Sequence, residues 1–313
     1  MAKATRQSFG EALARLGETH PELVVLDADL SKSTMTTMFA KKFPRRHFEF
    51  GIAESNMIGA AAGMALCGKV PVVASFACFL VGRLETIRVS VAYNKTNVKI
   101  AGTHAGLGIG EDGTSQMGLE DVAALRSLPG MVILQPADDA ETQQAVEWMI
   151  AHPGPVYIRL TRQKTADLHG ADYRFQMGVA DVVYEPPRKE GGKLQASVFA
   201  SGGTVGPAVD AAKDLSSRGF AVRVVNCATL NPIDEDAVAR AASESQRIVT
   251  VEDHNIIGGL GSAVCEAAAR KGAGVPVIRL GVREFGESGT GEELYAKYGL
   301  SAAHIADACL RNP

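Results

Sequence analysis

The sequence predicts two doubly wound α/β domains joined by a linker. Short apolar runs, of the length of buried parallel strands, alternate with longer runs typical of helices, and this alternation occurs in two separate stretches. Between them, over residues 164–194, the alternation is lost. A chain of 313 residues is also too long for one small domain. We therefore expect a first domain over 1–165, a linker over 166–194 and a second domain over 195–313.

The elements of the first domain follow from the spacing of apolar residues. Phe9, Leu13 and Leu16 recur at helical intervals and predict an amphipathic helix over 6–16. Residues 23–26 are continuously apolar, which is typical of a strand buried on both faces of a parallel sheet. The same order then repeats, with strands predicted at 70–76, 98–101, 131–135 and 156–160, and helices at 34–42, 55–66, 80–92, 119–125 and 140–150.

The linker and the second domain are predicted in the same way. Strand structure is expected around 175–184 of the linker, before a polar turn at 186–192. The second domain then alternates again, with strands at 197–200, 221–226, 247–251 and 275–280, and helices at 205–215, 234–242 and 258–270, followed by terminal helices. Such alternation favours a mainly parallel sheet with helices on both faces.

Composition argues against several classes of partner. The formal net charge of −3 gives no electrostatic basis for binding nucleic acid or a membrane surface. The longest apolar helical run, residues 57–67, is far shorter than the roughly 20 residues that span a bilayer, and the first residues lack the apolar core of a signal peptide. The five scattered cysteines favour reduced thiols over a disulfide framework. We therefore expect a cytoplasmic protein.

Residues 48–57 place one carboxylate, Glu54, where a buried helix should begin. The helix dipole favours an acid there by a few tenths to about 1 kcal/mol. The apolar neighbours Phe50, Ile52 and Met57 predict burial, and a buried lone carboxylate is costly unless something pairs with it. Glu54 is therefore either a helix-start residue or a working acid or base, and its immediate neighbours do not decide between the two.

Two loops follow predicted strands, at the carboxyl end of a parallel sheet where ligands bind. One covers residues 27–33, and the other covers 103–116. The second is rich in glycine, and loops longer than about 12 residues are more often functional. It does not open a helix, so it is not a dinucleotide-binding fingerprint. Its polar residues include His104, Glu111, Asp112 and Gln116.

Two further patterns have simpler explanations. The glycines at 258–261 resemble a phosphate loop, but glycine-rich helix starts are common, so close packing is the favoured interpretation. The isolated histidines lack the spacing of metal ligands, so we expect no metal site built by this chain.

Three sequence blocks together resemble the pyrimidine-binding domain of transketolases, which use thiamine diphosphate. The blocks are Gly51-Ile-Ala-Glu-Ser-Asn, Ser75-Phe-Ala-Cys-Phe and Gly110-Glu-Asp-Gly-Thr-Ser-Gln. The second half is similar to the transketolase C-terminal domain, with Val251-Glu-Asp-His followed by Gly258-Gly-Leu-Gly-Ser-Ala. The resemblance covers almost the whole chain.

The family's diphosphate-binding domain, with Gly-Asp-Gly and a downstream Asn around a divalent metal, has no counterpart here. The resemblance therefore implies the C-terminal subunit of a split transketolase. Its partner would be an N-terminal subunit that holds the diphosphate and Mg²⁺ (or Ca²⁺). A homodimer core within a heterotetramer is the expected assembly.

The resemblance also assigns roles around the cofactor. Glu54 would hydrogen-bond N1′ of the aminopyrimidine and so favour the tautomer that activates thiamine diphosphate. Phe79 and Phe76 match aromatic residues that flank the aminopyrimidine ring. Asp29 and Leu30 match loop residues near the cofactor.

For the substrate, His104, Asp112 and Gln116 match residues that contact sugar hydroxyls, and His104 and Gln116 are candidate catalytic groups. Arg6, Ser33 and Arg162 match the residues that grip the phosphate of a phosphorylated sugar, with Arg159 as the fallback if the register shifts. Many bacterial transketolases have His where this chain has Gln116, whereas the mammalian type has Gln.

The leading hypothesis is transfer of a two-carbon ketol unit between phosphorylated sugars. One alternative is the β subunit of a 2-oxoacid dehydrogenase decarboxylase component, and another is an enzyme similar to deoxyxylulose-phosphate synthase. Both fit the block at 110–116 less well. A degenerate subunit that only scaffolds a partner would be expected to have lost residues such as Glu54, and they are present.

Overall fold

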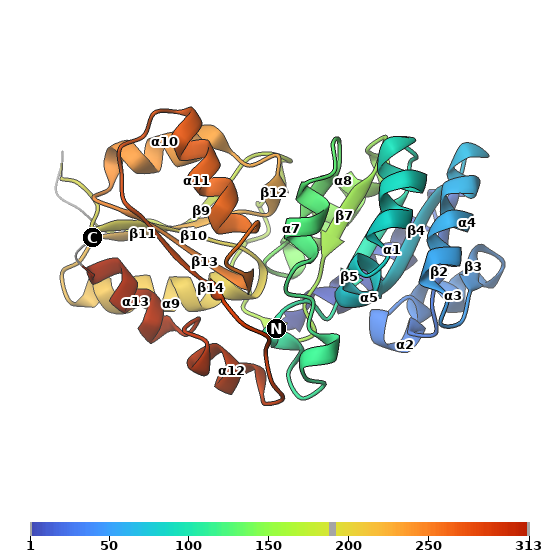
Figure 1. Ribbon diagram of the computed structural model, residues 1–313, viewed down its shortest axis with the longest axis horizontal. Coiled ribbons are helices and arrows are strands. Elements are labelled where there is room, and N and C mark those ends of the chain that lie inside the picture. The colour runs from blue at the N-terminus through green and yellow to red at the C-terminus, as the bar shows by residue number, and fades with distance from the viewer. Residues whose placement is uncertain (1, 188–191, 312–313) are drawn as a thin grey trace.

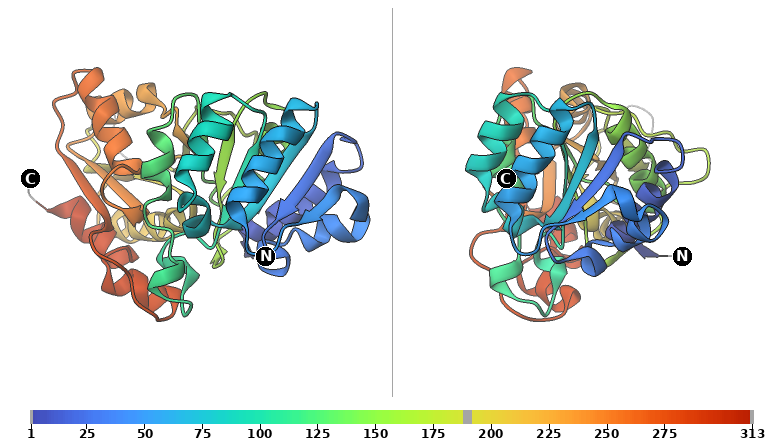
Figure 2. Two further views of the ribbon diagram at one scale, coloured as in Figure 1. Left: turned by 45° about the vertical axis from the view of Figure 1, so that its right-hand side comes forward. Right: turned by 90° about the vertical axis from the view of Figure 1, so that its right-hand side faces the viewer.

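The computed structural model describes residues 2–187 and 192–311. Two sheets of mainly parallel strands lie side by side, one of seven strands and one of five (Figure 1). Helices cover both faces of each sheet, as the sequence predicts for doubly wound α/β domains (Figures 1 and 2). The domain limits expected from the sequence, 1–165, 166–194 and 195–313, stay a prediction.

The seven-stranded sheet has the order β12-β6-β7-β5-β4-β2-β3. All of its strands are parallel except β12, so their carboxyl ends share one edge. The parallel strands are β2 (Leu23–Asp27), β3 (His47–Glu49), β4 (Val70–Phe76), β5 (Lys99–Thr103), β6 (Val132–Leu134) and β7 (Val156–Arg159).

Helices flank this sheet on two sides. One face is covered by α1 (Thr5–Leu16), α3 (Thr37–Lys42) and α8 (Asp139–Ala151). The other is covered by α4 (Glu54–Leu66), α7 (Asp121–Arg126) and a π-helical turn at Ile87–Tyr93. The short α2 (Ser31–Thr34) lies in the loop after β2.

The single helix predicted over 80–92 is wrong. The chain forms α5 (Ala77–Val81), α6 (Leu84–Thr86) and the π-helical turn instead. Gly82 ends α5, and Arg83 leaves the helical region with φ −111° and ψ 28°. Apolar spacing alone does not distinguish one long helix from consecutive short turns that bury the same residues.

The five-stranded sheet has the order β14-β13-β10-β11-β9, with only β9 antiparallel. Its strands are β9 (Asp181–Tyr184), β10 (Ala196–Ala200), β11 (Val222–Asn226), β13 (Ile248–Asn255) and β14 (Val277–Val282). Its helices are α9 (Val205–Ser217), α10 (Glu235–Glu244), α11 (Leu260–Arg270), α12 (Gly291–Lys297) and α13 (Ala302–Leu310).

Two pairings join segments that lie far apart in the sequence. Strand β12 (Thr229–Asn231) comes from the second half of the chain but pairs antiparallel with β6 at the edge of the first sheet. At the other end of the chain, β1 (Lys3–Ala4) pairs with β8 (Lys164–Thr165). Neither β12 nor the β1–β8 pair is predicted by the apolar pattern, because these strands have only two or three residues each.

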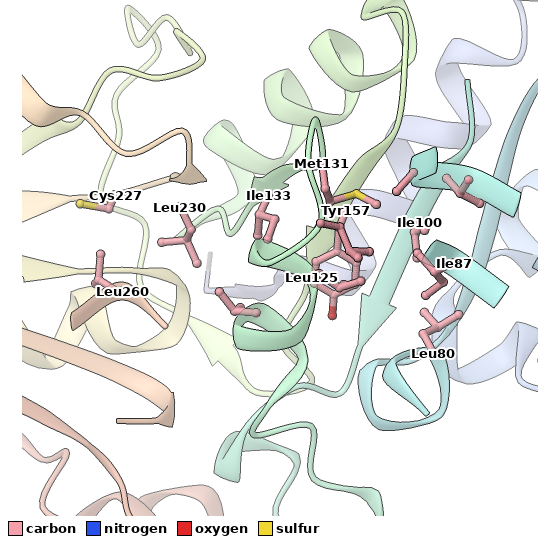
Figure 3. Close-up of a cluster of buried hydrophobic side chains, with 14 of the residues drawn as sticks. Leu80, Ile87, Ile100, Leu125, Met131, Ile133, Tyr157, Cys227, Leu230 and Leu260 are labelled. Carbon is pink, nitrogen blue, oxygen red and sulfur yellow. The ribbon is translucent and has the colours of Figure 1, made fainter. Parts of the chain in front are cut away.

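One apolar cluster continues from the first sheet into the second domain. Figure 3 shows Leu80, Ile100 and Tyr157 of the first domain in line with Leu230 and Leu260 of the second. Since the cluster is shared, the two domains bury apolar surface against each other.

His169, in the expected linker, bonds to one carboxylate of the first domain and to one of strand β9. The imidazole of His169 lies 2.9 Å from Asp138 Oδ2 and 3.0 Å from Asp181 Oδ2. Burial alone would lower the pKa of His169, but hydrogen bonds to Asp138 and Asp181 raise it to about 10. Strand β9 lies within the strand region expected around 175–184, whereas most of the polar turn expected at 186–192 lies outside the described residues. Within 2–187 and 192–311, no helix combines the length and apolar character needed to cross a bilayer.

Candidate active site

The residues singled out from the sequence gather at the carboxyl edge of the first sheet. Strands β2, β4, β5 and β7 are in parallel register, so the loops that follow them are neighbours. These strands and β3 deliver, directly or by the loop that follows, Asp29, Leu30, Ser33, Glu54, Phe76, Phe79, His104, Asp112, Gln116 and Arg162. Arg6, at the start of α1, reaches the same edge because its backbone amide donates to Thr161 O beyond β7.

His104 is a buried, neutral imidazole. Arg6 Nη1 lies 3.1 Å from His104 Nε2, and an arginine can only donate, so Nε2 accepts and the proton lies on Nδ1. That Nδ1 is 2.9 Å from Thr103 Oγ1. Burial, together with the positive charges of Arg6 and Arg162, lowers the pKa of His104 to about 3. At neutral pH the ring therefore serves as a neutral hydrogen-bonding group.

Two residues that follow β2 and β5, the strands on either side of β4, have left-handed backbone conformations. Asp29 has φ 62° and His104 has φ 57°. Residues other than glycine adopt this region at a cost, and they concentrate at functional sites where the surroundings hold them in place. The strained positions coincide with two residues that the sequence assigned to a site.

Two arginines, Arg6 and Arg162, form a positively charged side of the site, the positive pole. Burial and the nearby Arg162 lower the pKa of Arg6, and Asp112 partly offsets this. Arg6 Nη1 also donates to Ser33 O at 2.6 Å, so the carbonyl of Ser33 is the group engaged. Arg162 Nη1 donates to Ile109 O at 2.5 Å and to Glu111 at 3.0 Å. Arg6 Nε is buried and has no hydrogen-bond partner among the described residues.

Aromatic rings stack beside this pole. The ring centroids of Phe76 and Phe79 lie 5.5 Å apart with an interplanar angle of 8°. Phe76 also stacks on the imidazole of His104 at 3.9 Å. Phe76 is buried and Phe79 only partly so, which leaves Phe79 the more accessible ring for a planar ligand.

Glu54 is the first residue of α4 and is only 4% exposed. Across residues 2–187 and 192–311, its carboxylate has no hydrogen bond or ion pair. Ser55 and Asn56 are exposed, and the side chain of Ile52 is 85% exposed. A buried carboxylate without a partner is unfavourable for folding, so its position at the ligand edge fits a binding group better than a structural one.

The long loop over 103–116 is more ordered than expected. It contains short 3₁₀ turns at Leu107–Ile109 and Thr114–Gln116. Asp112 is exposed and close enough to Arg6 to influence its charge, whereas Gln116 is half-buried. Gln116 and Glu54 are not hydrogen-bonded to the Arg6–His104 group in the described part of the chain.

Two acidic residues behind the loop over 27–33 were not predicted as site residues. Glu49 accepts the amide of Asp29 at 2.5 Å and the hydroxyl of Ser31 at 2.7 Å. Asp27 accepts the amide of Leu30 at 2.8 Å, and burial raises its pKa to about 6. Asp27 ends the buried strand β2, and Glu49 ends the more exposed edge strand β3. An acidic residue at the end of a strand is the signal that could have identified both, because it can hold the loop that follows.

Two sequence interpretations are settled by burial. Arg159 is 2% exposed and its Nε donates to Asp121 at 2.8 Å, so the fallback role in phosphate binding is wrong. The close-packing interpretation of 258–261 is confirmed, because Glu252 accepts the amides of Leu260 at 2.6 Å and Gly261 at 2.8 Å. The protein's own carboxylate fills the place that a phosphate would take.

The geometry at this edge fits the pyrimidine end of thiamine diphosphate. A lone buried carboxylate and a partly exposed phenyl ring suit a planar aminopyrimidine. In the part of the chain that the structure describes, no group of three or more His, Cys, Asp or Glu residues could hold a metal ion.

Known family models match both halves of the chain. Residues 1–167 match the family model described as transketolase, pyrimidine binding domain. Residues 188–305 match the one described as transketolase, C-terminal domain. The chain belongs to the transketolase family. Within that family it aligns with the "Putative transketolase C-terminal section" of Methanocaldococcus jannaschii, at 42% identity over 97% of this chain and 94% of the relative.

Other transketolase relatives include both separate subunits and longer chains. A "6-deoxy-6-sulfo-D-fructose transketolase subunit" of a Clostridium species is 37% identical over 97% of this chain and 92% of its own. The mouse "Transketolase-like protein 2" is 38% identical over 97% of this chain, which spans only 48% of that longer relative. A solved structure described as "Split gene transketolase, inactive beta4 tetramer" has 42% identity and a TM-score of 0.87, covering 99% of this chain and 97% of that one.

Proposed function

We propose that this chain is the C-terminal subunit of a heteromeric transketolase that transfers a two-carbon ketol unit between phosphorylated sugars. The observation that carries the proposal is the buried, unpaired Glu54 at the same sheet edge as the Arg6–His104 pair. The Glu54 carboxylate suits a cationic or hydrogen-donating ring, whereas the Arg6–His104 pair suits an anionic polyol. The relatives named as separate transketolase subunits support the same assignment.

Thiamine diphosphate, when bound, supplies the carbanion chemistry that ketol transfer requires. Glu54 accepts the hydrogen at N1′ of the aminopyrimidine and so holds the tautomer that is active. Phe79 packs against the ring, with Phe76 behind it, and Asp29 and Leu30 line the adjacent loop. Mg²⁺ (or Ca²⁺) and the diphosphate are held by the partner subunit.

The substrate is oriented by the positive pole and by the loop over 103–116. Arg6 and Arg162 bind the phosphate of the sugar, with Ser33 beside them, since guanidinium groups suit the geometry of phosphate. His104 stays neutral at physiological pH, so it can exchange hydrogen bonds with sugar hydroxyls without placing a charge there. Asp112 and Gln116 contact the remaining hydroxyls.

The proposed assembly is a homodimer core joined by two N-terminal subunits. The related structure described as an inactive β4 tetramer supports self-association of such subunits.

The test mixes the chain with the product of a neighbouring gene that carries Gly-Asp-Gly and the downstream Asn, together with thiamine diphosphate and Mg²⁺. We expect ketol transfer from xylulose 5-phosphate to ribose 5-phosphate or to another phosphorylated acceptor, and none from either subunit alone. Pyruvate decarboxylation coupled to a lipoyl acceptor would instead support the dehydrogenase β subunit. Condensation of pyruvate with a phosphorylated aldehyde would support the synthase alternative.

A further inference from the structure

The second domain grips the loop over 103–116 through one buried carboxylate. Asp253, in β13, is 3% exposed. Its Oδ1 accepts the backbone amide of Leu107 at 2.7 Å, and its Oδ2 accepts that of Gly108 at 3.0 Å. The hydroxyl of Tyr295 in α12 donates to Oδ2 at 2.9 Å. Three donors therefore converge on this carboxylate, two from the loop and one from its own domain.

The glycines of the loop are shaped for this contact. Gly106 has φ 79°, and a β-carbon there would meet the Asp253 carboxylate. A β-carbon at Gly108 would lie 2.6 Å from the side chain of Gln163, whose Nε2 donates to Tyr295 Oη at 2.7 Å. The alternating glycines therefore let the loop backbone approach Asp253 and the group that supports it.

The gripped residues lie three and four positions after His104. Leu107 and Ile109 are fully buried and pack in a cluster with Val251 and Leu294 of the second domain. The far end of the loop is tied to the same domain, because Ser288 Oγ donates to Glu111 O at 2.6 Å and Thr114 donates to Gly286 O. The backbone that carries His104 is thus fixed from outside its own domain.

We propose that Asp253 is a positioning residue of the ketol-transfer site. By fixing the amides of Leu107 and Gly108, it keeps His104 in its left-handed conformation, with Nε2 against Arg6. Asp253 itself contacts neither substrate nor cofactor. The effect on catalysis rests on the proposed function. The bonds from Asp253 to the loop do not, because they lie within this chain.

A purely structural role for Asp253 predicts a different result from a positioning role. If Asp253 only stabilised the domain contact, its loss would lower the free energy of unfolding and leave the loop and the kinetics of the folded enzyme unchanged. If it positions the loop, its loss alters the loop locally while the rest of the chain stays folded. The backbone carbonyl of Asp253 keeps its bond from Arg159 Nη2 at 3.0 Å in any side-chain variant.

The experiment compares Asp253→Asn with Asp234→Ala. Asn keeps the size of the side chain but turns an N–H toward one of the two amides. Asp234 caps α10 in the same domain by accepting the amide of Ala237 at 2.8 Å. It also accepts the amide of Ala180 at 2.9 Å, and it has no hydrogen bond to the loop. Tyr295→Phe is the milder second variant, because it removes one donor and leaves the carboxylate in place.

Hydrogen exchange read by mass spectrometry on the subunit alone should show at least tenfold faster exchange in peptides covering 104–116 for Asp253→Asn, a smaller rise for Tyr295→Phe and none for Asp234→Ala. With the partner subunit, kcat/KM for ketol transfer should fall about 10- to 100-fold for Asp253→Asn, mainly through kcat.

Unchanged exchange in either loop variant would show that Asp253 does not hold the loop. Faster exchange with unchanged kinetics overturns the positioning role. Faster exchange in a complex whose wild type transfers no ketol unit overturns the proposed function alone.

Discussion

Replacing Glu54 by Gln should make the isolated subunit more stable and the complete enzyme less active. Glu54 is 4% exposed and its carboxylate is unpaired within the described residues, so neutralising it relieves a desolvation cost of about 1–2 kcal/mol. The loss of an acid at the first turn of α4 costs about 0.3–1 kcal/mol in the opposite direction. We therefore expect the free energy of unfolding to rise by roughly 0–2 kcal/mol.

The activity should move in the opposite direction. A hydrogen bond to a charged group contributes about 1.5–3 kcal/mol. Since 1.36 kcal/mol corresponds to a factor of ten in rate, Glu54→Gln should lower ketol transfer by about 10- to 150-fold.

Urea unfolding of the subunit gives the stability, and transfer by the reconstituted complex gives the rate. Asp234→Ala is the matched control, because Asp234 is also an acid at a helix start but caps a backbone amide. It should lose about 1 kcal/mol of stability and keep full activity. If Glu54→Gln behaves like this control, Glu54 is only a helix-start residue and the reasoning is refuted.

Three further predictions address the positive pole and the buried ion pairs. Arg6→Ala should raise KM for a phosphorylated donor about 10- to 100-fold, since it removes a charge-assisted contact, and steady-state kinetics should show little change with an unphosphorylated sugar. His169 has a pKa of about 10 in the folded chain and about 6.5 when unfolded, so its stabilisation is fully present below pH 6.5 and is lost as pH rises to 10. Urea unfolding should therefore show the stability gap between wild type and His169→Gln closing over that range, and a constant gap would contradict it. Asp121→Asn leaves Arg159 buried without its partner, so the free energy of unfolding should fall by about 3–5 kcal/mol, and a loss below 1 kcal/mol would be inconsistent with that ion pair.

The sheet and the location of the site could be predicted because they depend on local patterns. The continuous apolar run at 23–26 is found in the buried strand Leu23–Asp27. The carboxyl ends of parallel strands must share one edge, so polar loops after predicted strands point to a common site without any three-dimensional information. The gathering of Arg6 and His104 was inferred from the family resemblance, and the structure brings them to 3.1 Å.

The features missed by sequence reasoning depend on segments that are distant along the chain. Strand β12 has three residues and pairs with β6 about a hundred residues earlier, with Asn231 Nδ2 donating to Met131 O at 2.6 Å. Asp253 acts on backbone amides 146 and 145 residues away. Backbone amides carry no side-chain signature, so spacing and composition cannot identify which carboxylate will bind them.

Because β12 comes from the second half of the chain but pairs with β6 in the first sheet, the two halves depend on each other for folding. A truncation within the expected linker would remove the strand that covers β6 and leave a row of unpaired backbone groups, the kind of edge that promotes aggregation. The apolar cluster shared with Leu230 and Leu260 would be opened by the same cut. A gene rearrangement that keeps both halves in one chain preserves this packing. A rearrangement that separates them would leave two fragments, each exposing surface that is buried against the other in this fold.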